Sequence, residues 1–198
     1  MPRTIVVDFD GTITEQDLLD EIAETFGDPE VYRELDKGLD RRELTLHEVL
    51  RREFEPVRAS LDDVVDWVLA HARIRPGFRE LIEPVLAREG LSGVELYSNS
   101  VDPDPRGWRV RFLDETLCKT CEQACKRSTV SALADGSEVV YVGDGYSDRC
   151  AAEDADLVFA RRGLAAYLSG RGVPFEPFDD FFQIAGRIAR LDGGGRAS

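Results

Sequence analysis

Four aspartates stand at the ends of two apolar segments of the sequence. Asp8 and Asp10 close the first segment, and Asp144 and Asp148 follow the second. Alternation along a strand points the Asp8 and Asp10 side chains to the same side. If both segments are strands of one parallel sheet, the four carboxylates meet at one edge and repel each other unless a hard cation lies among them. Oxygen ligands of this kind suit Mg²⁺, which usually also contacts a substrate phosphate.

The alternative interpretation is a solvated acidic rim whose side chains only cap helices. It accounts for Asp148 alone as well as a metal site does. It accounts poorly for all four aspartates together, since strand ends rarely collect acids by accident. We therefore interpret the set as a candidate Mg²⁺ site beside a phosphate-binding pocket.

The segments before the aspartates have the composition of buried strands. Residues 4–9, 139–142 and 157–160 are short apolar runs, and helical patterns separate them. Strands that alternate with helices predict an α/β fold with a Rossmann-like, doubly wound parallel sheet. We expect further helices at 78–89, 126–134, 151–154 and 181–188, a strand at 93–97, and a half-exposed strand or hairpin arm at 108–112.

Residues 14–74 carry only helical patterns. Thr14, Thr45 and Ser60 each precede such a pattern, with an acid three residues later as in a capping box. A further short helix is predicted around 31–35. We interpret the block 14–74 as a helical cap inserted into an α/β core made of 1–13 and 75–191, with a disordered tail at 192–198.

The composition is that of an acidic globular protein. The 198 residues include 25 Lys and Arg against 39 Asp and Glu, a net charge of −14, and 42% of them are hydrophobic. This charge argues against a nucleic-acid partner, which demands a basic surface, but it allows a small phosphorylated metabolite in one locally positive pocket. Neither a membrane helix of roughly 20 apolar residues nor a signal peptide is apparent, so we expect a cytoplasmic protein with reduced cysteines and no membrane partner.

Two motifs resemble those of the haloacid-dehalogenase-superfamily phosphatases. Asp8-Phe9-Asp10-Gly11-Thr12 is similar to their first motif, Asp-x-Asp-x-Thr, and Gly143-Asp144-Gly145-Tyr146-Ser147-Asp148 is similar to their acidic motif, Gly-Asp-Gly-x-x-Asp. The helical block lies where the phosphoserine-phosphatase-like subgroup carries its cap. Within that subgroup, the chain most resembles the phosphatases of methionine salvage, which act on a methylthio-pentane phosphate.

The resemblance implies a mechanism and a metal site. Asp8 would attack phosphorus and form an aspartyl-phosphate, and Asp10 would protonate the leaving group and then activate water. Mg²⁺ would be held by the Asp8 carboxylate, the Asp10 backbone carbonyl and Asp144. The dehalogenases lack an acid at the position of Asp10, so a carbon–halogen reaction is not expected.

The resemblance also implies groups that bind phosphate. Thr12 and the backbone amides beside it would cradle phosphate oxygens, and Lys126 would screen Asp8 and the transferred group. Lys119 and Arg127 are the competing candidates for that cation. Asp148 would support the site by orienting a water on the metal or by pairing with the lysine.

One part of the family pattern is hard to find. A serine or threonine that ends another core strand normally binds phosphate, and Ser98 is the candidate by position. The segment from Arg75 to Leu86, however, resembles a fusion of the helices before and after that serine. We therefore favour the loss of one core β–α unit of roughly twenty residues, which would remove this hydroxyl and one strand beside the central strand.

Three cysteines precede Lys126 in the pattern Cys118-x-x-Cys121-x-x-x-Cys125. Such spacing is compatible with zinc, but a structural zinc site has four ligands, and Cys150 would have to supply the fourth. Reduced thiols that pack a loop are the favoured interpretation.

The sequence as a whole predicts Mg²⁺-dependent hydrolysis of a small phosphomonoester. A phosphotransferase or mutase with the same intermediate is one alternative. The other is a truncated, weakly active or non-catalytic relative that binds a phosphometabolite. The substrate and the oligomeric state stay open, and two histidines of the helical block are expected to be ordinary surface residues, His47 and His71.

Overall fold

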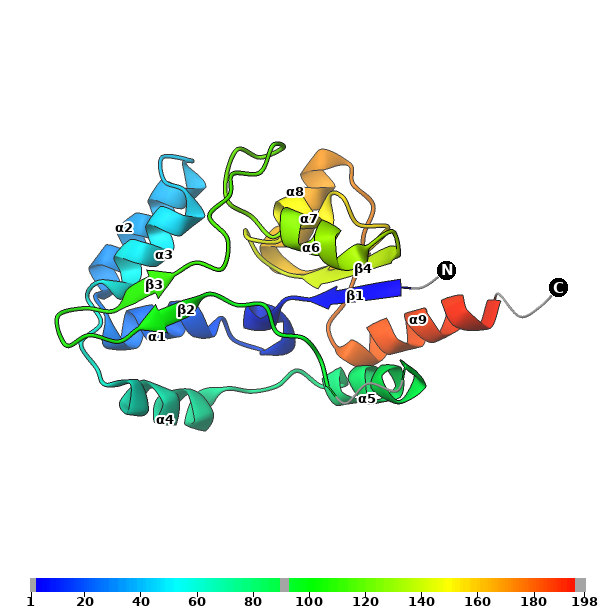
Figure 1. Cartoon of the computed structure of the whole chain (residues 1–198), viewed down its shortest axis with the longest axis horizontal. Coiled ribbons are helices and arrows are strands. Elements are labelled where there is room, and N and C mark those ends of the chain that lie inside the picture. Colours follow the sequence, from blue (N-terminus) through cyan, green and yellow to red (C-terminus); the bar gives the residue numbers. More distant parts are fainter. Residues whose placement is uncertain (1–2, 90–92, 195–198) are drawn as a thin grey trace. The chain divides into compact units, whose positions relative to one another are not determined.

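The structure is a computed structural model that describes residues 3–89 and 93–194 (Figure 1). It divides into two compact units. The first, here the α/β unit, comprises Met1–Glu15, Ile74–Leu96 and Lys126–Ser198. The second, here the helical unit, comprises Gln16–Arg73 and Tyr97–Cys125.

The α/β unit contains four strands and five α-helices in the described residues. The strands are β1 (Arg3–Val7), β4 (Glu138–Gly143), β5 (Leu157–Ala160) and β6 (Glu176–Pro177). The helices are α5 (Phe78–Glu89), α6 (Arg127–Ala134), α7 (Arg149–Ala152), α8 (Arg162–Arg171) and α9 (Phe181–Gly194). The sequence patterns predicted neither α8 nor the two-residue strand β6.

The strands form one parallel sheet in the order β1-β4-β5-β6. Val7 lies opposite Val142, and the Asp8 N–H donates a hydrogen bond of 2.9 Å to the Val142 carbonyl. The carboxyl ends of β1 and β4, which are side by side in Figure 1, are therefore level. The turns that follow these two strands start next to each other, as the sequence predicted.

Both faces of the sheet are covered, because alternate residues of β4 point to opposite sides. Tyr141 packs with residues of α6, α7 and α8, whereas Val140 and Val142 pack with residues of α5 and α9. Figure 1 shows α5 and α9 side by side, with the sheet between them and α6–α8. This arrangement confirms the predicted doubly wound α/β fold.

The helical unit contains α1 (Leu18–Phe26), α2 (Pro29–Asp40), α3 (Leu46–Phe54), α4 (Leu61–His71) and an antiparallel hairpin of β2 (Ser100–Asp102) and β3 (Arg109–Arg111). Its core is formed by Ile22, Phe54, Val57, Val64 and Trp108. The Trp108 indole N–H donates to the Ala59 carbonyl at 3.0 Å, which satisfies the polar end of this buried ring. Residues 97–125 thus cluster with the helices, although the sequence analysis assigned them to the α/β core.

Two of the three predicted helix caps are confirmed. Thr45 forms a complete capping box with Glu48 at the start of α3, and the Ser60 hydroxyl accepts from an amide in the first turn of α4. The third is wrong, because α1 begins later and its N-cap is Asp17. Thr14 instead stabilises the turn after β1, where its hydroxyl lies 3.1 Å from the Phe9 carbonyl.

The predicted strand at 93–97 does not form. Residues 93–99 have neither helix nor strand structure, and the side chains of Val94 and Leu96 are 62% and 78% exposed. An apolar segment forms a buried strand only where a neighbouring strand can pair with it. Among the described residues β1 pairs with β4 alone, so β1 is an edge strand, as expected from the loss of one β–α unit.

Two further observations concern the last helix of the chain and the length of its helices. Helix α9 continues to Gly194, so the first residues of the expected tail are helical, and 195–198 lie outside the described residues. No helix in the described part of the chain is long and apolar enough to cross a membrane.

Candidate active site

The turn after β1 presents the first aspartates. Asp8 precedes a five-residue π-helical turn, Phe9–Ile13, in which Gly11 has a φ of 70°. A Cβ atom at Gly11 would lie 2.3 Å from Asp144 Oδ2, closer than any real contact. Glycine is therefore required here both for the left-handed backbone and for the approach of the second acidic turn.

A buried arginine holds this turn in place. Arg75 is 6% exposed, and its Nε donates to the Thr12 carbonyl at 2.8 Å. Its Nη2 donates to the carbonyls of Gly11 and Thr14, each at 2.9 Å. One guanidinium thus satisfies three carbonyls of a turn that has no regular ladder of its own. The sequence analysis used Arg75 only as a boundary, because nothing local signals a contact with residues sixty positions earlier.

The turn after β4 is organised around Asp148. Its Oδ2 accepts the backbone N–H groups of Asp144 and Gly145, each at 3.0 Å. Asp148 is fully buried and Asp144 is 7% exposed. These bonds fix the loop that carries Asp144, so Asp148 acts on the site through the backbone as well as through its charge.

Three of the predicted acids converge. Carboxylate oxygens of Asp8, Asp144 and Asp148 lie within 4.8 Å of one another. Lys126, at the start of α6, contacts Asp8 Oδ1 and lies 2.7 Å from Asp148 Oδ1. The lysine predicted to screen Asp8 is therefore the one that reaches it. The competing cations are elsewhere, with Lys119 exposed in the helical unit and Arg127 paired with Asp154.

A tyrosine that the sequence analysis did not select completes this cluster. The Tyr141 hydroxyl donates to Asp148 Oδ1 at 2.8 Å from the middle of β4. The residue looks like ordinary strand core in the sequence, and only alternation would place it on the same face as the helix that follows Asp148. Asp148 therefore accepts from an ammonium, a phenol and two amides.

Burial and neighbouring charges shift the pKa values of Asp8, Asp148 and Lys126 in opposite directions. Burial raises the pKa of Asp8 to about 6, although the Lys126 ammonium opposes the shift. For Asp148, burial also raises the pKa, but Lys126 and the hydrogen bonds outweigh it and hold the pKa below its usual value. Burial would lower the pKa of Lys126, yet Asp148 and its other neighbours raise it well above the ordinary value. Lys126 and Asp148 thus form an ion pair in which the carboxylate is fully buried and the lysine is partly exposed.

The remaining predicted residues of the first turn lie in the same place. Thr12 is fully buried, and its hydroxyl donates to Asp144 Oδ1 at 3.2 Å, so it links the two acidic turns. Asp10 is half-buried in the same π-helical turn. The structure thus brings five of the predicted residues into contact and places the sixth in the same loop: Asp8, Thr12, Lys126, Asp144 and Asp148 with Asp10.

Two arginines after β5 add positive charge to this edge of the sheet. Arg162 Nη1 lies 3.5 Å from Asp144 Oδ2. Arg161 has two buried side-chain nitrogens, Nε and Nη1, with no hydrogen-bond partner in the described residues. The chain is acidic overall, yet the edge with the aspartates therefore also carries Lys126 and two arginines, which suits an anionic ligand.

Ser98, the candidate for the missing phosphate hydroxyl, belongs to the helical unit. It is exposed and has no regular secondary structure. Because no described strand pairs with the outer edge of β1, no serine is presented there in the manner the family pattern requires. The described part of the α/β unit therefore contains the first motif, the lysine and the acidic motif, but no serine at the end of a strand beside β1.

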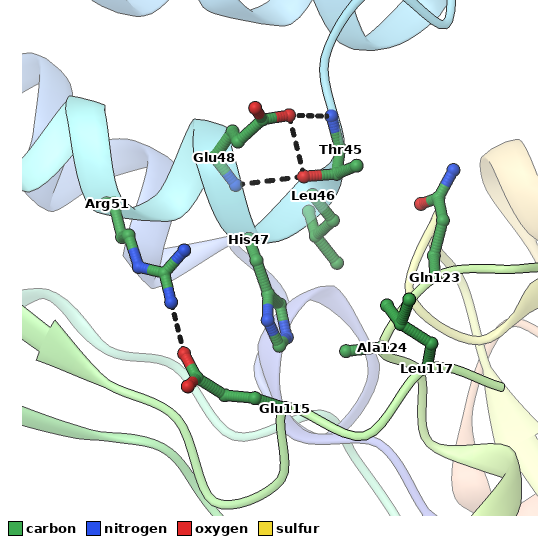
Figure 2. Close-up of a pocket in the computed structure, with 9 residues that line it drawn as sticks. All are labelled: Thr45, Leu46, His47, Glu48, Arg51, Glu115, Leu117, Gln123 and Ala124. Carbon is green, nitrogen blue, oxygen red and sulfur yellow. Dashed lines mark hydrogen bonds and ion pairs between the residues drawn. The ribbon is translucent and has the colours of Figure 1, made fainter.

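The helical unit contains a separate pocket of about 370 Å³ (Figure 2). None of the aspartates above lines it. His47 stacks on Phe112 with ring centroids 3.7 Å apart, and Arg51 forms an ion pair with Glu115 beside them. The pocket is lined by Thr45, Leu46, His47, Glu48, Arg51, Glu115, Leu117, Gln123 and Ala124.

Comparison with known proteins identifies the family of the chain. The family model described as haloacid dehalogenase-like hydrolase matches residues 2–156. A 2-hydroxy-3-keto-5-methylthiopentenyl-1-phosphate phosphatase of Geobacillus thermodenitrificans is 30% identical, over 93% of this chain and 94% of the relative. The phosphatase of the same name from Exiguobacterium sibiricum is 27% identical, over 95% of this chain and 97% of its own.

Solved structures show the same fold. A phosphoserine phosphatase from T. onnurineus aligns with a TM-score of 0.67 at 19% identity and covers 95% of this chain and 94% of its own. A phosphoserine phosphatase with a phospho-aspartyl intermediate analogue aligns with a TM-score of 0.62 at 16% identity, over 93% and 97% of the two chains. The chain therefore belongs to the haloacid dehalogenase-like hydrolase family, as a phosphatase with the fold of the phosphoserine phosphatases.

Proposed function

We propose that the protein hydrolyses a small phosphomonoester in a Mg²⁺-dependent reaction, with a phosphoryl group carried transiently by Asp8. The observation that carries this proposal is the contact of Lys126 with both Asp8 and Asp148, at the edge where Asp144 also points. A carboxylate next to a fixed cation is suited to receive a phosphoryl anion, because the cation offsets the repulsion between the two negative groups.

The residues present fit a magnesium ion. The donor set consists of carboxylate oxygens within 4.8 Å of one another, and Mg²⁺ prefers such hard ligands. Asp8, Asp144 and the backbone carbonyl of Asp10 are the groups proposed to hold it. When bound, the ion supplies positive charge that neutralises the nucleophile and the incoming phosphate.

The chain's own residues carry out the proton and phosphoryl transfers. A carboxylate oxygen of Asp8 forms a bond to phosphorus while the bond from phosphorus to the ester oxygen breaks. Asp10 gives its proton to the departing oxygen, which leaves as an alcohol. Asp10 then takes a proton from a water that attacks the aspartyl-phosphate, so inorganic phosphate leaves and both aspartates return to their starting states.

Lys126 and Asp148 have supporting roles in this proposal. Lys126 stays protonated and screens the Asp8 carboxylate and the phosphoryl oxygens. Asp148 holds Lys126 in place and, through its bonds to the amides of Asp144 and Gly145, shapes the second acidic turn. Thr12, whose hydroxyl is 3.2 Å from Asp144, is proposed to position that carboxylate and to present backbone amides to phosphate.

The substrate is proposed from the relatives. Two curated relatives that match almost the whole chain are named for a methylthiopentenyl phosphate with hydroxyl and keto groups. We propose a small phosphorylated metabolite of that chemical class as the substrate, and we keep a cytoplasmic location as a prediction.

A second candidate function is binding of such a metabolite with weak or no turnover. The specific observation in its favour is the edge position of β1 together with the exposed Ser98. Without a hydroxyl from a neighbouring strand, one phosphate oxygen would lack a donor, which costs about 1–3 kcal/mol for a charged acceptor.

Hydrolysis of p-nitrophenyl phosphate with and without millimolar Mg²⁺ separates the two candidates. The enzyme interpretation expects turnover that requires Mg²⁺ and disappears in Asp144→Asn. A matched exposed control, Asp66→Asn on α4, should keep full activity. If the protein binds inorganic phosphate but releases neither nitrophenol from this ester nor inorganic phosphate from a methylthiopentenyl phosphate, the enzymatic proposal is wrong and the binding function stands.

A further inference from the structure

Three thiols lie together in a loop that the phosphatase site does not use. Cys118, Cys121 and Cys125 follow β3 in the helical unit, and residues 112–126 have no helix or strand. The sulfur atoms of these three residues lie within 4.8 Å of one another. Four ligands around a zinc ion with Zn–S bonds of about 2.3 Å place neighbouring sulfur atoms roughly 3.8 Å apart. The thiols are therefore already near the separation that one ion requires.

The backbone of the loop is folded around the first thiol. The Cys118 N–H donates to the Gln123 carbonyl at 2.9 Å, and the Glu122 N–H donates to the Cys118 carbonyl at 2.9 Å. The Thr120 N–H donates to Cys118 Sγ at 3.4 Å. This contact fixes the position of the Cys118 sulfur within the loop.

One residue of this turn has an unfavourable backbone. Glu122, directly after Cys121, has a φ of 58°, a region that costs a residue with a side chain about 1 kcal/mol or more. This residue lies between Cys121 and Cys125, within the turn in which the three sulfur atoms come together.

We propose that Cys118, Cys121 and Cys125 bind one zinc ion through three thiolates, with the fourth position taken by a ligand outside this loop. Thiolates are soft ligands that select zinc, whereas Mg²⁺ takes the hard carboxylate oxygens of Asp8 and Asp144. The two sites are thus chemically distinct. Each thiol gives up its proton when zinc binds, so the affinity rises with pH. Cys121, whose S–H now points to the Gln123 carbonyl at 3.6 Å, exchanges that bond for the metal.

The ion would be structural. The loop forms part of the wall of the pocket in the helical unit, through Leu117, Gln123 and Ala124 (Figure 2). Leu117 is 67% exposed, so burial of apolar side chains does little to order this segment. A metal link between positions 118 and 125 supplies the missing constraint directly before Lys126 in the chain.

The test is the metal content of the full chain after incubation with one equivalent of zinc and excess Mg²⁺, followed by desalting. We expect one zinc per chain by mass spectrometry in the wild type and a loss of bound zinc in Cys118→Ser, Cys121→Ser and Cys125→Ser. Lys119→Ala, an exposed residue of the same loop, is the matched control and should retain the ion. A wild type that retains no zinc, or cysteine variants that retain it fully, would overturn the proposal.

Cobalt provides a second measurement that needs no variant. Titration of the wild type with Co²⁺ should produce an intense thiolate-to-cobalt absorption band and the visible bands of a tetrahedral ion, and zinc should remove both. Only weak octahedral bands, or a disulfide between the loop cysteines after purification under reducing conditions, would contradict a thiolate site. The cobalt spectra report on the thiolates and do not depend on phosphatase turnover. A protein that proves inactive as a phosphatase could therefore still show the zinc site.

Discussion

Asp148 is a buried carboxylate that contacts both the proposed catalytic residues and the core of the sheet. It accepts from Lys126, Tyr141 and two backbone amides, so its negative charge is satisfied from four sides. Lys126 contacts this carboxylate and Asp8 at the same time. Its phenol partner does no proton chemistry, because burial raises the pKa of Tyr141 well above the ordinary value and keeps it a donor.

Replacing Tyr141 with Phe tests this connection. The variant removes one donor from a buried carboxylate, so we expect the free energy of unfolding to fall by about 1–3 kcal/mol. If Lys126 shifts as a consequence, kcat should fall by roughly tenfold, with a smaller change in KM. The matched control is Tyr167→Phe, whose hydroxyl bonds to the partly exposed Glu153 and should cost less than about 1 kcal/mol. Equal effects of the two substitutions on kcat would contradict the account.

Gly11→Ala tests the approach of the two acidic turns. A Cβ atom there would overlap the Asp144 carboxylate, and the φ of 70° disfavours alanine as well. We expect Mg²⁺ to raise the melting temperature of the wild type by binding to the native state. Gly11→Ala should lose this effect, and its activity should fall by at least roughly a hundredfold. Gly170→Ala, where a Cβ meets nothing within 4 Å, should leave both unchanged or slightly raise stability. A Gly11→Ala enzyme with normal Mg²⁺ dependence would show that the turns do not need this contact.

At the scale of elements, the sequence predicts β1, β4 and β5 well because each is a compact apolar run, and the first two also end at an acid or glycine. The same reasoning fails for residues 93–97. That segment has the composition of a strand, but it forms one only if a neighbouring strand pairs with it. Sequence composition does not show whether such a neighbour exists. Arg75 and Tyr141 were missed for a related reason, since their roles come from contacts across the fold rather than from local patterns.

Helix α3 carries a buried acid with a predicted effect on stability. Glu53 is 3% exposed, and burial together with Asp20 and Asp17 raises its pKa to about 8. Because the folded-state pKa lies above the unfolded value of about 4.3, the native state binds the extra proton. The stabilisation is complete below the unfolded pKa and is lost as the pH rises to about 8.

At about pH 8.5, Glu53→Gln should therefore have a free energy of unfolding that is higher than that of the wild type by on the order of 2–3 kcal/mol, as measured by urea denaturation. The difference should shrink toward about pH 5, where the wild-type carboxyl keeps its proton in the folded state. Glu55→Gln, an exposed residue of the same segment, is the control and should change little at either pH. A pH-independent difference would indicate that packing rather than ionisation separates Glu53 from glutamine.

At the scale of the whole molecule, every residue of the proposed site that the structure connects belongs to the α/β unit. The helical unit carries its own core, its own pocket and the three-cysteine loop. This division places the connected residues of the proposed phosphoryl chemistry in one unit. The proposed chemistry should therefore be testable on a small generic phosphate ester.

The central claim, that Asp8 carries the phosphoryl group, is tested most directly by acid-quenched single-turnover mass spectrometry with p-nitrophenyl phosphate and Mg²⁺. The account predicts one phosphoryl group on the peptide that contains Asp8, formed no slower than phosphate is released. Asp8→Asn should show neither the adduct nor turnover while it keeps its fold. Phosphate release at the normal rate from Asp8→Asn, or an adduct confined to another residue, would contradict the account.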